Sequence, residues 1–242
     1  MALVLDYVAL ETRRTLRDTG FVIFGIGMPV LMYLLFTNIG GGADAAWKTA
    51  SMVGMAAYGA LGAALSAGTG VAEDKALGWL RQLRITPMTP AQVVVGRALT
   101  ASVVVLPAIL TVLAVGGLVN GVSLAVWQWV LLTVLLWLGS LPFTLLGIGN
   151  GYRLSAQSTG VVNVGCNLGF SIIGGLWFPA QFFPGWLQGI STYTPTRAIS
   201  QIGTSIGQGE APGLLALTVL TGWLAVFGSY AVVSYRKAAR TA

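Results

Sequence analysis

The sequence predicts an all-α polytopic membrane protein with six transmembrane helices. Hydrophobic residues make up 55% of its 242 residues, whereas charged residues make up only 8%. A soluble domain carries about 25% charged residues, and a soluble surface with so few charges would expose large apolar patches. The composition therefore excludes a soluble globular domain and, because it is so apolar, a disordered chain.

The same composition excludes several kinds of site. The chain contains no histidine and one cysteine, Cys166. A His-based catalytic system, an intrachain disulfide and a cysteine zinc site are therefore impossible. The net charge of +6 is compatible with nucleic-acid binding, but the basic residues are scattered between apolar runs, so membrane topology explains them better. We predict no catalytic residue, no metal site and no nucleic-acid partner.

Uncharged runs divide the chain into candidate spans. One helical crossing needs about 20 apolar residues. The run at 98–152 is long enough for two crossings, with a Gly-rich turn at 116–121, whereas the run at 154–196 could hold one or two. The runs without a charged side chain are 19–43, 49–72, 98–152, 154–196 and 211–235.

The distribution of basic residues decides the number of spans. With the N-terminus inside and one span in the run at 154–196, eleven of the 13 Lys and Arg residues lie on the cytoplasmic side. A seventh span would move the last three basic residues outside. We therefore predict six spans with both termini cytoplasmic, at 20–39, 50–71, 97–118, 127–149, 157–178 and 212–234.

Residues 1–242 form a single transmembrane domain in this interpretation, with two special segments outside the spans. Residues 1–19 combine an apolar helical face with three arginines, which is typical of a helix lying on the membrane surface. Residues 179–200 are apolar but interrupted by proline and glycine. We expect them to form short extracellular re-entrant helices; an ordinary surface loop is the alternative.

The cytoplasmic segment 73–87 combines apolar and charged residues. At 100° per residue its apolar side chains share one side and its charges the other, and Pro87 ends the helix. Such a helix could lie on the membrane and present charge to a partner protein, or it could only anchor the loop.

No nucleotide-binding site is present in the sequence. A phosphate-binding loop needs a lysine after glycine, and none of the three lysines follows one. All seven acidic residues lie outside the predicted spans, which disfavours proton coupling through a buried carboxylate. The energy for any uphill transport would therefore come from a partner.

The predicted fifth span carries a polar stripe. Its polar residues recur every fourth position, so they share one helix face. Asparagine inside a membrane is costly unless its amide is hydrogen-bonded. The stripe could line the substrate path or dimer interface, or it could bond to other helices of the same subunit. Its candidate site residues are Thr159, Asn163, Asn167 and Ser171.

The order of these features resembles the ATP-binding-cassette (ABC) type 2 permease family, the membrane subunits of drug, lipid and polysaccharide exporters. The resemblance extends over nearly the whole chain. It rests on Glu73-Asp74-Lys75, Gly78, Thr86-Pro87-Met88-Thr89 and Gly96-Arg97 between the second and third spans, and on Phe183-Pro184-Gly185-Trp186-Leu187 with Pro195 before the last span. It implies that 73–87 is a coupling helix that docks on a separate ATPase. The expected coupling residues are Glu73, Asp74, Lys75, Gly78, Trp79, Arg81, Arg84 and Pro87.

The resemblance implies the permease subunit of an ATP-driven exporter in a bacterial plasma membrane. Two permease copies, identical or related, would pair with two ATPase subunits, which bind ATP and Mg; this chain would hold no cofactor and would not itself be an enzyme. The apolar composition favours an amphipathic or hydrophobic substrate, as in multidrug resistance, and contact with membrane lipid. The alternatives are an ATP-independent carrier or channel, a lipid-modifying membrane enzyme and a structural or sensory subunit.

Overall fold

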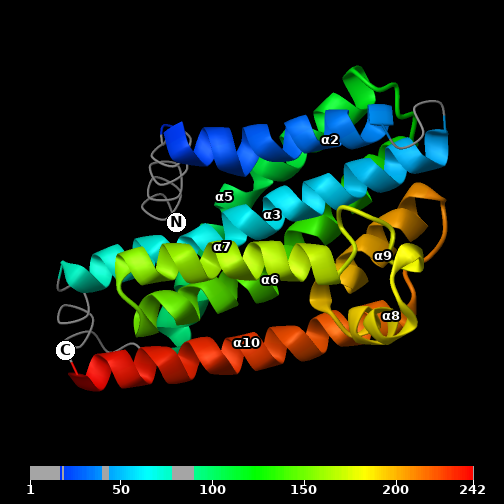
Figure 1. Ribbon diagram of the computed structural model, residues 1–242. Coiled ribbons are helices and arrows are strands. Elements are labelled where there is room, and N and C mark those ends of the chain that lie inside the picture. Colours follow the sequence, from blue (N-terminus) through cyan, green and yellow to red (C-terminus); the bar gives the residue numbers. More distant parts are fainter. Residues whose placement is uncertain (1–16, 18, 40–43, 78–89, 242) are drawn as a thin grey trace.

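The computed structural model describes residues 17, 19–39, 44–77 and 90–241, and every regular element in these ranges is helical (Figure 1). The long elements are η1 (Phe21–Gly27) continued by α2 (Met28–Ile39), α3 (Ala45–Ala76), α5 (Pro90–Leu118), α6 (Val126–Arg153), α7 (Ala156–Ile173) and α10 (Leu214–Thr241). The short elements between α7 and α10 are η2 (Ala180–Phe182), α8 (Gly185–Thr192) and α9 (Pro195–Gly207).

The long helices run side by side and alternate in direction between two ends of a bundle (Figure 1). We call one end the Lys75 end: α3, α6 and α10 finish there, and α5 and α7 begin there. The opposite end, which carries α8 and α9, we call the Trp186 end. The first described residues and the end of α10 both lie at the Lys75 end (Figure 1).

Four of these helices, α3, α5, α6 and α10, are long and apolar enough to cross a membrane. They correspond to the predicted second, third, fourth and sixth spans. η1 with α2 and α7 occupy the positions of the other two spans, but α2 contributes a shorter apolar stretch and the asparagines of α7 make it less apolar. The six-span count therefore stays a prediction.

Helix α3 lies at the centre of the bundle and α10 at its edge (Figure 1). In the most apolar stretch of each helix, 78% of the α3 residues are buried but only 17% of those in α10. Glycine allows α3 to approach α6 closely: a Cβ on Gly147 would lie 2.6 Å from the carbonyl oxygen of Leu65, and one on Gly68 would overlap the Gly147 carbonyl. Such close contacts stabilise helix pairs through packing.

Two helices end at residues that differ from the predicted ends of their spans. We expected the second span to end near residue 71 and Glu73 and Asp74 to lie outside it, but both belong to the last turn of α3, which continues to Ala76. Asp74 has a charged partner there, so its place at the helix end does not leave it unpaired. The fifth span was predicted to reach residue 178, but α7 ends at Ile173 because Gly175 adopts φ +71°.

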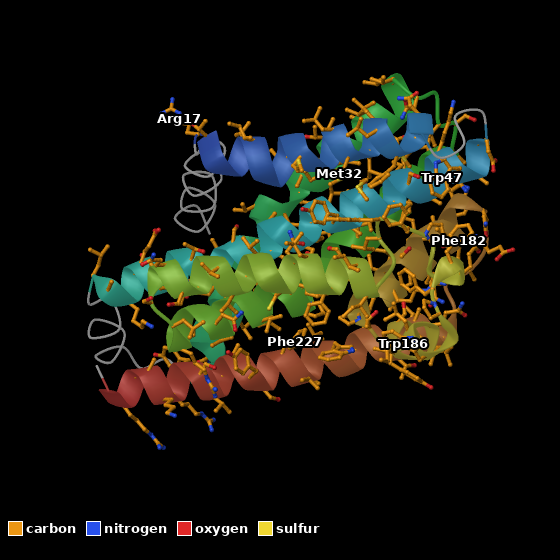
Figure 2. All side chains as sticks on the ribbon, in the orientation of Figure 1. Arg17, Met32, Trp47, Phe182, Trp186 and Phe227 are labelled. Atoms are coloured by element: carbon orange, nitrogen blue, oxygen red, sulfur yellow. The ribbon has the colours of Figure 1, made fainter. Side chains whose placement is uncertain are left out.

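The predicted re-entrant segment contains η2, α8 and the start of α9 at the Trp186 end. Pro184 and Thr194 precede the two helices, and the Thr194 hydroxyl accepts a hydrogen bond from the Arg197 backbone N–H. Phe182 and Trp186 project from this end of the bundle (Figure 2), and both are exposed. Entry of this segment into the membrane stays a prediction. The predicted surface helix at 1–19 lies outside the described residues except for 17 and 19.

Candidate functional site

Lys75 joins the end of α3 by hydrogen bonds to the α6–α7 corner, which we define as residues 151–155 between the last turn of α6 and the start of α7. Its Nζ donates to the carbonyl oxygens of Gly151, Tyr152 and Leu154 at 3.1, 3.1 and 2.6 Å. The last carbonyls of an α-helix have no partner within the helix and carry partial negative charge, so a lysine there satisfies them and complements the helix dipole. A displacement of α3 at this point would therefore act directly on the α6–α7 corner.

Asp74 forms an ion pair with Arg97 of α5. Their side chains are 35% and 25% exposed, respectively, so water screens the pair only in part. The pair joins the residues on the two sides of the undescribed segment 78–89. Together, Asp74 and Lys75 bind the last turn of α3 to α5 and to α6.

The structure describes three of the eight predicted coupling residues. Asp74 and Lys75 hold neighbouring helices, whereas Glu73 is exposed. The other five lie outside the described residues: Gly78, Trp79, Arg81, Arg84 and Pro87. The role of 73–87 in coupling stays a prediction.

A buried chain of amide and phenol groups crosses the bundle near the same end. Asn150 of α6 donates to Asn163 Oδ1 of α7 at 2.8 Å, and Asn163 donates in turn to the Leu65 carbonyl of α3 at 2.7 Å. Tyr230 of α10 donates its hydroxyl hydrogen to Asn150 Oδ1 at 2.9 Å. Four helices are therefore linked by hydrogen bonds in a region where an unpaired amide would be costly.

Arg153 extends this chain to the surface. Its Nε donates to Ser234 Oγ at 3.1 Å, and its guanidinium lies 5.0 Å from the centre of the Tyr230 ring, within cation–π range. Arg153 itself is exposed. The guanidinium thus contacts α10 through its Nε hydrogen bond to Ser234 and its approach to the Tyr230 ring.

The predicted polar stripe of α7 faces the interior of the chain over most of its length. Thr159, Asn163 and Ser171 are buried, with exposures of 0%, 5% and 0%. Asn167 is half-buried, and its amide nitrogen would lie 3.1 Å from a Cβ on Gly62 of α3. These contacts agree with hydrogen bonding within one subunit; a role of the four residues in the substrate path or dimer interface stays a prediction.

The opposite side of α7 is open. Val161, Val164 and Ile172 are at least half-exposed, and a Cβ on Gly165 or Gly169 would meet nothing within 4 Å. A small-residue face of this kind permits close approach of another membrane helix. Helix α7 therefore has a polar side that is bonded internally and an apolar side that is free for a neighbour.

Asn150, Arg153 and Tyr230 were missed in the sequence analysis. Asn150 lies one residue past the end of the predicted fourth span at 127–149 and three residues before the charged Arg153. An asparagine within an apolar helix was the usable signal, as it was for Asn163. The tyrosine carried no sequence signal, because its partner is 80 residues away.

Comparison with known proteins agrees with this architecture. Residues 7–206 match the family model described as ABC-2 type transporter. The chain is also similar to a protein of Bacillus subtilis (strain 168) named "Putative transport permease YvfS", with 23% identity over 222 residues, which cover 90% of each chain. Among the described residues, no three His, Cys, Asp or Glu side chains are grouped as a metal site would require. From the extent of the family match, the chain is a multi-pass membrane permease that belongs to the ABC-2 type transporter family.

Proposed function

We propose that this chain is the membrane subunit of an ATP-driven exporter and that it forms the path for an amphipathic or hydrophobic substrate, such as a drug, an antibiotic or a lipid-like molecule. A separate ATPase subunit would bind and hydrolyse ATP with Mg, and this chain would have no enzymatic activity of its own. Membership of the family supports a transport permease. The lack of a phosphate-binding loop in the sequence supports a separate source of energy.

One observation carries the proposal: the three hydrogen bonds from Lys75 to the α6–α7 corner. The predicted coupling segment starts at this point of the chain. A partner that moves this segment would pull on the end of α3 and, through Lys75, on α6 and α7. The buried bonds among Asn150, Asn163 and Leu65 would carry the same movement into the bundle, since packed helices shift as units.

The assembly would contain two permease copies and two ATPases. The open apolar face of α7, with Gly165 and Gly169, supports contact with a second copy. The basic residues at the Lys75 end support a cytoplasmic location for this end and for both termini, in a bacterial plasma membrane. The described acidic residue best placed to meet an ATPase is Glu73, because it is exposed and lies beside the coupling segment.

Purification of the native complex in mild detergent tests the proposal. We expect an ATPase to co-purify with the wild type and to be lost in Glu73→Arg, since reversal of an exposed charge disturbs docking but not folding. Glu210→Arg is the matched control, because Glu210 is also exposed but lies at the Trp186 end. If no ATPase co-purifies with the wild type, the ATP-driven function is wrong, and passive flux of an ATP-independent carrier or channel should be measured.

A further inference from the structure

The α8–α9 corner, which we define as residues 191–197, lies halfway along the bundle. On one side of it, Nε1 of Trp223 in α10 donates to the Tyr193 carbonyl at 2.8 Å. Two residues beyond it, the Ile199 side chain would lie 3.0 Å from a Cβ on Gly139 of α6. Gly139 is near the middle of α6, about 20 Å from the start of that helix at the Trp186 end. The corner therefore reaches from the Trp186 end into the bundle.

Arg197 places a guanidinium at this depth. The residue is half-buried, and its backbone N–H donates to Thr194 Oγ1. Its guanidinium makes no hydrogen bond, ion pair or ring contact with any residue that the structure describes. It also adds positive charge to the first turn of α9, where the helix dipole is already positive. A half-buried cation without a partner is unfavourable, so this position favours an anion.

The described part of the chain holds no acidic residue at the level of Arg197. Asp44 precedes α3 and Glu210 follows α9, which extends about 15 Å beyond Arg197, so both lie near the Trp186 end. The acids at 73 and 74 lie at the Lys75 end. Two copies related by an axis along the membrane normal have the same groups at the same levels. None of these acids can therefore neutralise Arg197, in one copy or in two.

Arg197 begins a polar stripe on α9. Gln201 and Thr204 follow it at intervals of four and three residues, so the three side chains fall within an arc of about 60°. All three are half-buried, whereas Ile199 and Ile202 on the other side of the helix are buried. Arginine and glutamine are costly against lipid. The stripe therefore suits the wall of a polar passage that leads from the middle of the bundle to the Trp186 end.

An exposed apolar stripe on α8 ends at the same corner. Trp186, Ile190 and Tyr193 are 70%, 53% and 65% exposed, and at 100° per residue they fall within an arc of about 60°. Arg197 follows Tyr193 by four residues. A molecule held at the corner would therefore have an apolar surface and a cation within reach, which matches a ligand with an apolar body and an anionic group.

We propose that Arg197 binds the anionic group of an amphipathic substrate, a carboxylate, phosphate or sulfonate, while the apolar part of the substrate lies on the exposed stripe of α8. A guanidinium suits such a group because its N–H donors match two oxygens at once. Gln201 lies one turn farther along the same stripe and offers an amide to the same ligand. This inference rests on the proposed transport function and deepens it, since it makes the substrate an amphipathic anion.

Binding of a fluorescent amphipathic anion, 11-(dansylamino)undecanoate, to the full chain in phosphatidylcholine nanodiscs tests the proposal. The uncharged methyl ester is the matched probe, and empty nanodiscs measure the partition of each probe into lipid. We expect the wild type to bind the carboxylate about tenfold more tightly than the ester, because a hydrogen bond to a charged group contributes this much. Arg197→Gln should bind both probes equally. Lys48→Gln, which removes the other described cation of the Trp186 end, is the control and should keep the preference.

This assay contains neither ATP nor an ATPase, so its result is independent of the ATP-driven function. A carboxylate preference that Arg197→Gln abolishes supports the site even if no ATPase co-purifies with the chain. Equal affinity of the wild type for both probes, or no binding of either, would overturn the proposal, as would an unchanged preference in a folded Arg197→Gln variant. If Arg197→Gln does not fold, Arg197→Lys keeps the charge and should retain the preference, and the comparison of the two probes on the wild type still decides.

Two further outcomes would assign the guanidinium to another ligand. Displacement of the dansyl carboxylate by an equal concentration of inorganic phosphate would overturn the proposal, because the site would then bind the free ion without an apolar part. Loss of a dimer in Arg197→Gln, with the affinity for both probes unchanged, would overturn it as well, because Arg197 would then serve the contact between two copies.

Discussion

The Lys75 end and the Trp186 end of the bundle both contain side chains that donate to carbonyls at helix ends, but only at the Lys75 end does one cation bind three of them. At the Lys75 end, the ammonium of Lys75 binds the last carbonyls of α6. At the Trp186 end, two neutral donors satisfy carbonyls at helix ends: Gln128 donates to the Ile206 carbonyl at 2.7 Å, and Trp223 to that of Tyr193 at 2.8 Å. Lys48 adds a single, longer bond to the Asn120 carbonyl, just past α5, at 3.4 Å.

This difference distinguishes two functions of a helix cap: satisfying free carbonyls and responding to nearby charge. A neutral donor satisfies a carbonyl and is indifferent to nearby charge, which suits the aromatic end of the bundle, where Tyr58 and Trp177 pack edge to face. A cation also responds to the charges of an approaching partner. Lys75 therefore combines the closure of a helix end with sensitivity to a charged neighbour, whereas Gln128 and Trp223 provide closure alone.

The largest effect on stability is expected where α3 and α6 pack together, because these two helices extend from one end of the bundle to the other. Gly147→Val should prevent folding or cost at least about 1–3 kcal/mol, since the new side chain would collide with the backbone at Leu65. Gly222→Val on the exposed side of α10 is the control and should fold normally. Yield of monodisperse protein and its thermal unfolding provide the measurement; a stable Gly147→Val protein would contradict the packing.

Removing the capping side chains of Lys75 and Gln128 tests the difference between the two ends of the bundle. Lys75→Met should lower the free energy of unfolding by about 1.5–3 kcal/mol, because charged hydrogen bonds are lost, and Gln128→Met by about 0.5–1.5 kcal/mol. Only Lys75→Met should impair coupling to the ATPase. Unfolding in mixtures with an increasing share of denaturing detergent measures the change in the free energy of unfolding. Equal losses of coupling in both variants would contradict the distinction between the ends.

The buried asparagine amides should contribute less to the free energy of unfolding than the Lys75 bonds. Asn163→Leu removes the partner of Asn150 and of the Leu65 carbonyl, so we expect a loss of about 1 kcal/mol, whereas Asn167→Leu should cost less because Asn167 is only half-buried. A double-mutant cycle with Asn150→Leu should reveal a positive coupling energy with Asn163 and none with Asn167. Additive effects of Asn150 and Asn163 would show that their bond contributes no stability.

The smallest effect on folding is expected at the exposed aromatic residues of the Trp186 end. Trp186→Ala should change the free energy of unfolding by less than about 0.5 kcal/mol, because the side chain is 70% exposed. Fluorescence quenching by lipids brominated on their acyl chains would locate Trp186 relative to the membrane. Strong quenching supports the re-entrant placement of 179–200, and its absence favours the surface-loop alternative.

The positions of the long helices could be predicted because uncharged runs record where a chain can cross a membrane. Their ends were harder to predict. Sequence alone places Glu73 and Asp74 outside a span, since their charge is costly in lipid, but Asp74 stays in α3 because Arg97 lies beside it. Gly175 ended α7 before the apolar run ended, and no periodicity marks which glycine will adopt positive φ.

The candidate site was predictable only in part. The charges beside the second span identified Lys75, but not its partners, because backbone carbonyls have no signature in a sequence. The stripe in α7 identified Asn163 as costly to leave unbonded, but not its partners, Asn150 and the Leu65 carbonyl, which are distant in the sequence. Long-range partners of this kind depend on how the helices pack.

The most direct test of coupling through Lys75 compares the wild-type complex with Lys75→Gln in inverted membrane vesicles. ATP hydrolysis and ATP-dependent uptake of a fluorescent amphipathic dye would be measured on samples with equal ATPase content. We predict that Lys75→Gln still binds the ATPase, hydrolyses ATP and loses most of the uptake, because the α6–α7 corner no longer follows α3. Uptake equal to that of the wild type in Lys75→Gln would contradict the account.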